Sequence, residues 1–248
     1  MSGHSKWSTI KRKKGAADAK RGQLFTKLAR EITVAARTGL PDPDANARLR
    51  IAVQKARSES MPKDNIDRAI ARAIGDNSIE QYEEIYYEGY GPGGTAIMIQ
   101  TMTDNKNRTV GELRSSLTRS GGSLAENGSV GWMFDQTGVI TILVNGSEDD
   151  ALALIAIDAG AIDFSVEDGV AEIYTAPTEL HKVSEQLASV GYEIDNAELT
   201  MKPQNILQPD LDQAVKAIRL LEKLEDLDDV QAVYSNLDIS DEVLAEVG

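Results

Sequence analysis

The chain has 248 residues, 41% of them hydrophobic and 27% charged, with a formal net charge of -14. This composition is typical of a globular protein, and the length allows one large domain or two to three small ones at roughly 100–200 residues each. The absence of cysteine excludes disulfides, thiolate metal sites and cysteine nucleophiles, and the sequence has neither an apolar run of ~18 residues nor a secretory signal. We therefore expect a cytoplasmic protein with no membrane partner.

The charge is divided unevenly along the chain. Residues 1–77 hold 17 Lys and Arg against 8 Asp and Glu, a formal charge of +9, whereas residues 78–248 hold 9 against 32, a charge of -23. Such asymmetry indicates a module that faces nucleic acid, joined to an acidic body.

Residues 1–22 show no apolar periodicity and carry seven Lys and Arg with Asp18 as the one acidic residue. This predicts a flexible basic arm. Basic side chains that neutralise phosphates release counterions, and an indole can stack on unpaired bases. The alternative is a solvated tail. The nucleic-acid-binding candidates of the arm are Lys6, Trp7, Lys11, Arg12, Lys13, Lys14, Lys20 and Arg21.

Residues 23–77 predict a three-helix bundle, with helices over 23–39, 44–58 and 62–75. Leu24, Leu28 and Ile32 recur at helical spacing, Asp44 or Asn46 caps the second helix, and Pro62 suits the first position of the third. The outward positions are basic, and from them we take as further candidates Lys27, Arg30, Lys55 and Arg68. Base readout would depend on Asn65 and Arg68, and no helix-turn-helix is predicted.

The apolar periodicity then changes to that of strands. We expect strands over 82–90 and 95–104, a helix over 107–120 with Thr109 and Glu112 as a capping box, and a strand over 128–134. The predicted helix carries a second basic cluster with the candidates Lys106, Arg108 and Arg114. Arg108 lies near the helix N-terminus, where phosphate is favoured. A solvated helix face is the alternative.

The segment "GYGPGG" at 89–94 matches a dinucleotide-binding pattern by letter. That pattern opens a helix, whereas this segment contains Pro92 and opens a strand, so we predict a tight turn with glycines at positive φ. A loop pressed against a partner or a nucleic-acid backbone is the alternative.

The order that follows is strand 138–144, helix 149–159, strands 162–168 and 169–176, helix 177–190 and strand 192–202. This is the split βαβ order of a ferredoxin-like domain. A helix over 210–225, a strand over 229–237 and a short helix over 241–247 have no core of their own, so we expect them to complete the sheet begun at 82. The predicted fold is an arm (1–22), a helical bundle (23–77), a discontinuous α+β domain (78–135 plus 204–248) and a ferredoxin-like α+β domain (136–203) inserted in it.

The sequence holds no catalytic constellation. The two histidines, His4 and His181, lack partners for a catalytic relay or a zinc site, and we interpret the acidic stretch 222–229 as a solvated helix end. We predict no enzymatic activity, no cofactor and no metal.

Long motifs connect the chain with a known family. "MSGHSKWSTIKRKKGAADAKRGQLFTKLAREITVAARTG", "NARLRIAVQKARSESMPKDNIDRAI", "YEEIYYEGYGPGG", "TDNKNRTVGELRSSLTRSGGSL" and "GSVGWMF" closely resemble the YebC family. The resemblance covers essentially the whole chain. It implies a helical bundle followed by two α+β domains, the last one ferredoxin-like and inserted. Members are described as transcriptional regulators that bind DNA. Mitochondrial relatives activate translation of cytochrome oxidase, and bacterial relatives are linked to ribosomes and stalled translation.

Two hypotheses follow. The first is a transcriptional regulator that binds duplex DNA, as the usual description of the family implies. The second is a translation factor that binds ribosomal RNA. In this case the arm would bind phosphates of an RNA surface recognised by its shape, and the acidic body would contact basic ribosomal proteins.

Replacing Lys11–Lys14 by Ala is expected to weaken nucleic-acid binding and to flatten its dependence on salt, because fewer counterions are released. The measurement is log Kd against log salt concentration. An unchanged slope would contradict a role for the arm.

Overall fold

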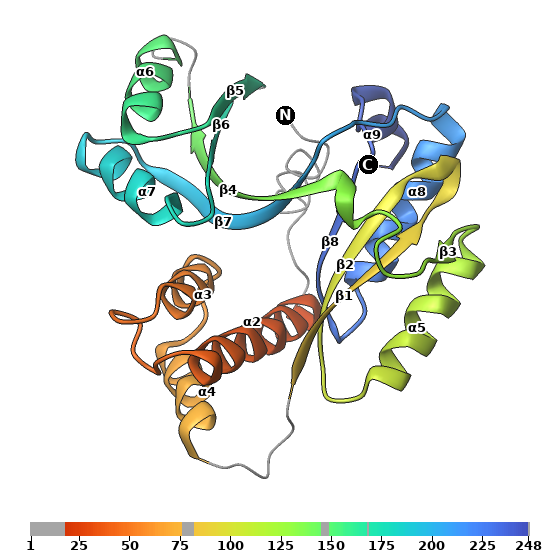
Figure 1. The fold of residues 1–248 in the computed structure, drawn as a ribbon, viewed down its shortest axis with the longest axis horizontal. Coiled ribbons are helices and arrows are strands. Elements are labelled where there is room, and N and C mark those ends of the chain that lie inside the picture. Colours follow the sequence, from red (N-terminus) through yellow and green to blue (C-terminus); the bar gives the residue numbers. More distant parts are fainter. Residues whose placement is uncertain (1–17, 76–81, 145–148, 168, 248) are drawn as a thin grey trace. The chain divides into compact units, whose positions relative to one another are not determined.

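The computed structural model describes residues 18–75, 82–144, 149–167 and 169–247. It divides into two units (Figure 1). Phe134–Lys202 form one, and the segments up to Met133 and from Pro203 form the other. The candidates Lys6, Trp7 and Lys11–Lys14 lie outside the described residues.

Three helices form the N-terminal bundle: α2 (Asp18–Thr38), α3 (Ala47–Ser58) and α4 (Lys63–Gly75). Their apolar stripes meet in one core that includes Leu28, Ile32, Leu49 and Ile66. The cap of α3 is Asn46, whose side-chain oxygen accepts a hydrogen bond from the Leu49 N–H at 3.1 Å. The three predicted helices are confirmed. However, α2 begins at Asp18, so the last residues assigned to the arm are helical.

A four-stranded antiparallel sheet follows, in the order β3-β1-β2-β8. The strands are β1 (Glu83–Tyr90), β2 (Ala96–Thr103), β3 (Ser123–Leu124) and β8 (Val230–Ser235), and the helices of this region are α5 (Lys106–Arg119), α8 (Leu211–Glu225) and α9 (Asp241–Val247). Side chains of β2 and β8, such as Ile97, Ile99 and Val233, share one core with Leu117 of α5 and Leu220 of α8. The C-terminal segment therefore completes this sheet, as predicted.

The turn between β1 and β2 is the short 3-10 helix η1 (Pro92–Gly94). Gly93 has φ +69° and Gly94 has φ +80°, a backbone conformation that glycine adopts without steric cost. The tight turn predicted for "GYGPGG" is confirmed.

Two local predictions are wrong. Of the segment 128–134 only Phe134 belongs to a strand, because the Glu88 carboxylate accepts the N–H groups of Gly128, Val130 and Gly131. These backbone N–H groups are therefore not available for hydrogen bonds to a neighbouring strand. The chain instead forms the 3-10 helix η2 (Gly131–Met133). Helix α5 is capped by Asn105 rather than by a Thr109–Glu112 box.

The second unit contains β4 (Phe134–Leu143), α6 (Asp149–Ala159), β5 (Asp163–Glu167), β6 (Val170–Thr175), α7 (Leu180–Ser189) and β7 (Ile194–Pro203). Its sheet has the order β5-β6-β4-β7, and α6 and α7 cover one face of it (Figure 1). This is the ferredoxin-like arrangement. The predicted fold class is confirmed: a three-helix bundle and two α+β domains, the ferredoxin-like one inserted in the other. The residue limits of the domains stay a prediction.

Gly122→Ala is expected to destabilise the protein by roughly 1–3 kcal/mol, because the new Cβ would lie 2.4 Å from the Tyr90 carbonyl oxygen. Gly111→Ala is the matched control. It lies inside α5 with no atom within 4 Å of an added Cβ, so it is expected to stabilise by up to ~1 kcal/mol. Urea unfolding of both variants measures this, and equal signs would contradict the prediction.

Candidate nucleic-acid interface

One buried carboxylate, Asp229, gathers two of the predicted phosphate-binding arginines. Asp229 is 2% exposed. Arg108 of α5 donates to it at 2.8 and 2.9 Å, and Arg30 of α2 at 3.3 Å. The hydroxyls of Thr109 and Thr103 donate at 2.8 and 3.1 Å. This Asp229 cluster, formed by these five residues, joins the bundle to the sheet.

Burial alone would raise the pKa of Asp229. Hydrogen bonds from Arg108, Thr109 and Thr103 outweigh burial and hold the pKa below its usual value, so Asp229 is ionised at neutral pH. The interpretation of 222–229 as a solvated helix end is therefore wrong for its last residue. The reason is that tertiary folding brings Arg108, which is distant in sequence, next to Asp229.

The neighbouring backbone engages further cations of α2. Lys27 donates to the Glu225 carbonyl oxygen at 2.5 Å, and Arg30 donates to that of Asp228 at 2.7 Å. The Arg30 guanidinium also lies 5.1 Å from the centroid of the Tyr82 ring. Three candidates, Lys27, Arg30 and Arg108, are thus engaged in contacts within the protein.

The remaining candidates have mixed surroundings. Arg21 and Arg114 are exposed, Lys55 is half-buried, and Lys20 lies in α2, where its side chain is outside the described part. Lys106 is exposed and forms an ion pair with Glu83 at 2.7 Å. Arg68 is exposed, but its guanidinium donates to the Asn65 side-chain oxygen and, at 3.0 Å, to the Asp64 carbonyl oxygen. The two positions predicted for base readout, Asn65 and Arg68, therefore bond to each other.

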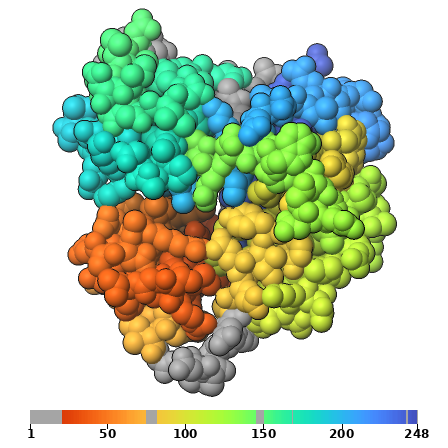
Figure 2. All heavy atoms as spheres, in the orientation of Figure 1, coloured from red at the N-terminus to blue at the C-terminus, as the bar shows by residue number. Residues whose placement is uncertain are grey.

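Other bundle cations have exposed side chains and no such contact within the described part of the chain. Among the described residues, the exposed bundle cations with neither an ion pair nor a side-chain hydrogen bond are Arg21, Arg37, Lys63, Arg57 and Arg72. Figure 2 shows the bundle surface in red to orange. Arg57 and Arg72 were recognisable in the sequence only as outward basic positions, because the tertiary structure decides which of the described residues pair with each other.

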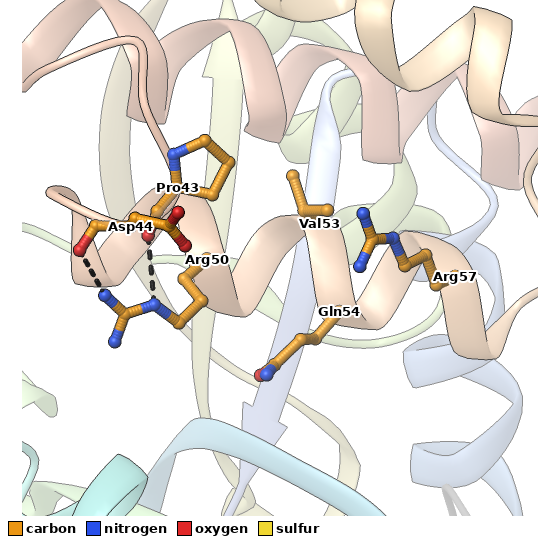
Figure 3. Close-up of a pocket in the computed structure, with 6 residues that line it drawn as sticks. All are labelled: Pro43, Asp44, Arg50, Val53, Gln54 and Arg57. Carbon is orange, nitrogen blue, oxygen red and sulfur yellow. Dashed lines mark hydrogen bonds between the residues drawn. The ribbon is translucent and has the colours of Figure 1, made fainter.

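A polar surface cavity of about 390 Å³ lies on α3 (Figure 3). Arg50 is fixed at its edge by the carbonyl oxygens of Pro43 and Asp44, at 2.9 and 2.6 Å. Gln54 and Arg57 continue the same helix face, and Val53 is the one apolar side chain that α3 contributes to the lining. Such a lining extends the polar surface of α3 and lacks the apolar walls typical of a small-molecule pocket.

The described residues offer little for catalysis. Within these residues, no three His, Asp or Glu side chains are grouped so that they could hold a metal ion. His181 lies 3.2 Å from Glu185, one helical turn away on the same helix, and His4 lies outside the described part. No helix in the described ranges is long and apolar enough to cross a membrane.

Two family models match the chain. The description "TACO1/YebC protein N-terminal domain" matches residues 5–76, and "TACO1/YebC second and third domain" matches residues 82–237. The chain belongs to the TACO1/YebC family. The resemblance seen in the sequence motifs is thereby confirmed.

Relatives within the family are similar over nearly their full length. A "Probable transcriptional regulatory protein" of Chloroflexus aurantiacus is 54% identical over 99% of this chain and 98% of its own. One of Dehalococcoides mccartyi is 52% identical over 98% and 97%. The crystal structure of a conserved hypothetical protein, Aq1575 from Aquifex aeolicus, has 45% identity and a TM-score of 0.84, covering 92% of this chain and 94% of that one.

Asp229→Asn is expected to destabilise the protein by roughly 3 kcal/mol, because it leaves Arg30 without its carboxylate and Arg108 with the outer carboxylate of Asp104 alone. Asp104→Asn is the control. It also removes a carboxylate from Arg108, but from the outer ion pair at 2.7 Å, and exposed pairs contribute about 0–1 kcal/mol. Chemical unfolding at pH 7 compares the two.

The same carboxylate makes the free energy of unfolding depend on pH. Since the pKa of Asp229 is lowered on folding, its contribution is complete above the unfolded pKa of ~3.9 and is lost as the pH falls through the folded value. The wild-type protein should therefore lose more stability than Asp229→Asn between about pH 5 and pH 2. Parallel curves would contradict the role of this carboxylate.

Proposed function

We propose that this chain is a non-enzymatic, nucleic-acid-binding regulator of gene expression that acts in the cytoplasm as a DNA-binding transcriptional regulator. One observation carries the proposal: the basic charge is concentrated in residues 1–77, and exposed bundle cations such as Arg57 and Arg72 form no internal ion pair among the described residues. Relatives at 52–54% identity bear the name "Probable transcriptional regulatory protein", which supports the same function.

In this proposal the bundle and the arm contact phosphates together. The available bundle cations hold the protein against the backbone, and the arm residues Lys6, Trp7, Lys11, Arg12, Lys13 and Lys14 add further contacts. Lys27, Arg30 and Arg108 stabilise the fold instead, since their side chains already bind carboxylate or carbonyl oxygens. The acidic body is repelled by phosphate, so it orients the bundle toward the nucleic acid.

A second candidate is a ribosome- or RNA-binding translation factor that relieves stalled translation. The observation that favours it is the bond between Asn65 and Arg68. With these side chains engaged, the start of α4 offers no free pair to read base edges, which sequence-specific binding requires. Contacts to phosphates depend on the shape of the nucleic-acid backbone and not on the base sequence, so they can form with structured RNA as well as with DNA.

Replacing both Arg57 and Arg72 by Ala is expected to lower the slope of log Kd against log salt by about 0.9 for each phosphate that the variant no longer neutralises. The matched control is Lys216→Ala, which removes an exposed cation of α8 that pairs with Asp212 at 2.5 Å and should leave the slope unchanged. Fluorescence anisotropy with a labelled duplex measures both. Equal slopes for all three proteins would contradict a bundle interface.

The choice between DNA and RNA needs a competition experiment at physiological salt. A transcriptional regulator should bind its promoter duplex at least ~10³-fold more tightly than random DNA. A ratio near one, with co-sedimentation of the protein on ribosomes, would replace the first candidate by the second.

A further inference from the structure

Two aromatic side chains outside the basic interface share one hydrogen-bond acceptor. The Tyr90 hydroxyl and the Trp132 indole N–H each donate to the Ser129 carbonyl oxygen at 3.2 Å. Trp132 is nevertheless 62% exposed and Tyr90 36%. We call Tyr90 and Trp132 the aromatic pair. Their polar tips are occupied, so their exposed ring surfaces are what a partner can contact.

A buried charge holds the loop that carries this pair. The Glu88 carboxylate, 5% exposed, accepts the N–H groups of Gly128, Val130 and Gly131 at 2.7, 2.6 and 2.8 Å. Burial would raise the pKa of Glu88, but these backbone hydrogen bonds outweigh it and lower the pKa. The loop is thereby fixed around an anion, and Trp132 is presented in a preorganised position.

Strand alternation separates the pair from the basic residues of α5. A Cβ added to Gly89 would contact Leu117, so Gly89 faces α5 and its neighbours Glu88 and Tyr90 face the other side of the sheet. At the far end of β1, Arg48 pairs with Glu84 at 2.6 Å. Tyr90 lies six positions along the strand from Glu84, which is about 20 Å at ~3.3 Å per residue and exceeds the screening length of ~8–10 Å.

The one charged residue of the segment 120–133 that carries Trp132 is acidic. Glu126 is exposed, lies in the same turn through the Ser129 N–H bond to its carbonyl oxygen at 3.2 Å, and forms no ion pair within the described part of the chain. Between residues 120 and 181 the sequence contains no Lys or Arg. A phosphate placed here would meet Glu126 without a cation from this loop, so the site disfavours nucleic acid.

A guanidinium group satisfies each of these features. It is planar and stacks on an indole by cation–π attraction, and its N–H groups bind a carboxylate. We propose that the aromatic pair and Glu126 form a docking surface for an arginine-bearing segment of a basic protein, with the guanidinium stacked on Trp132 and paired with Glu126. This partner is of a different class from the nucleic acid of the proposed function and does not depend on it.

Intrinsic fluorescence provides a direct test, because the chain has two tryptophans and Trp7→Phe leaves Trp132 as the sole emitter. We would titrate this full-length protein with a nonapeptide of alternating Arg and Gly, with its Lys counterpart and with a ten-nucleotide oligo-U. The Arg peptide should change the emission saturably and bind several-fold more tightly than the Lys peptide. Oligo-U should leave the emission unchanged.

Binding of the fluorescein-labelled Arg peptide by anisotropy then tests the residues. Trp132→Ala should weaken it about tenfold and Glu126→Gln by a smaller factor. The control Ile206→Ala, which removes another exposed apolar side chain (55%), should leave it unchanged. The proposal fails if the Arg peptide does not bind, if Trp132→Ala and Glu126→Gln bind it as the wild type does, or if oligo-U quenches Trp132 and displaces the peptide. The last result would identify a base-stacking site.

Discussion

The carboxylate of Asp229 is the interaction on which the connection between bundle and sheet depends. It lies in the loop after α8, directly before the first residue of β8, and receives hydrogen bonds from β2, α5 and α2. A buried carboxylate is stable only when it is paired and hydrogen-bonded. Any arrangement that separated α2 or α5 from β8 would leave this charge, or the guanidiniums around it, without a partner.

This constraint sorts the basic residues into two groups. Lys27, Arg30 and Arg108 lie within reach of the acidic end of α8 and stabilise the fold. Arg57 and Arg72 are exposed and form no ion pair with another residue of the described ranges, which is why the proposed interface assigns them to phosphate. The net charge of a segment therefore overstates the number of cations that can bind phosphate.

Glu88 organises its surroundings in the same way, but through backbone N–H groups instead of guanidiniums. Its three hydrogen bonds prevent 128–133 from pairing as a strand, and Trp132 of this segment is exposed. The alternating pattern of "GSVGWMF" could not reveal this, because the carboxylate responsible is about 40 residues away in the sequence. The capping box predicted at Thr109 failed for a related reason, since that hydroxyl is bound to Asp229.

Apolar periodicity, capping residues and glycine turns determined the helices of the bundle, the ferredoxin-like order and the return of the C-terminal strand. The helices, strands and turns depend on neighbours within a few residues, and the C-terminal strand was expected to return because its segment has no core of its own, so these features can be derived from the sequence alone. The partner of each charged side chain was decided only by the tertiary structure, because Arg30 and Asp229, or Glu88 and Gly131, meet through folding of the whole chain. Which cations and aromatic rings remain exposed for a partner follows from that pairing.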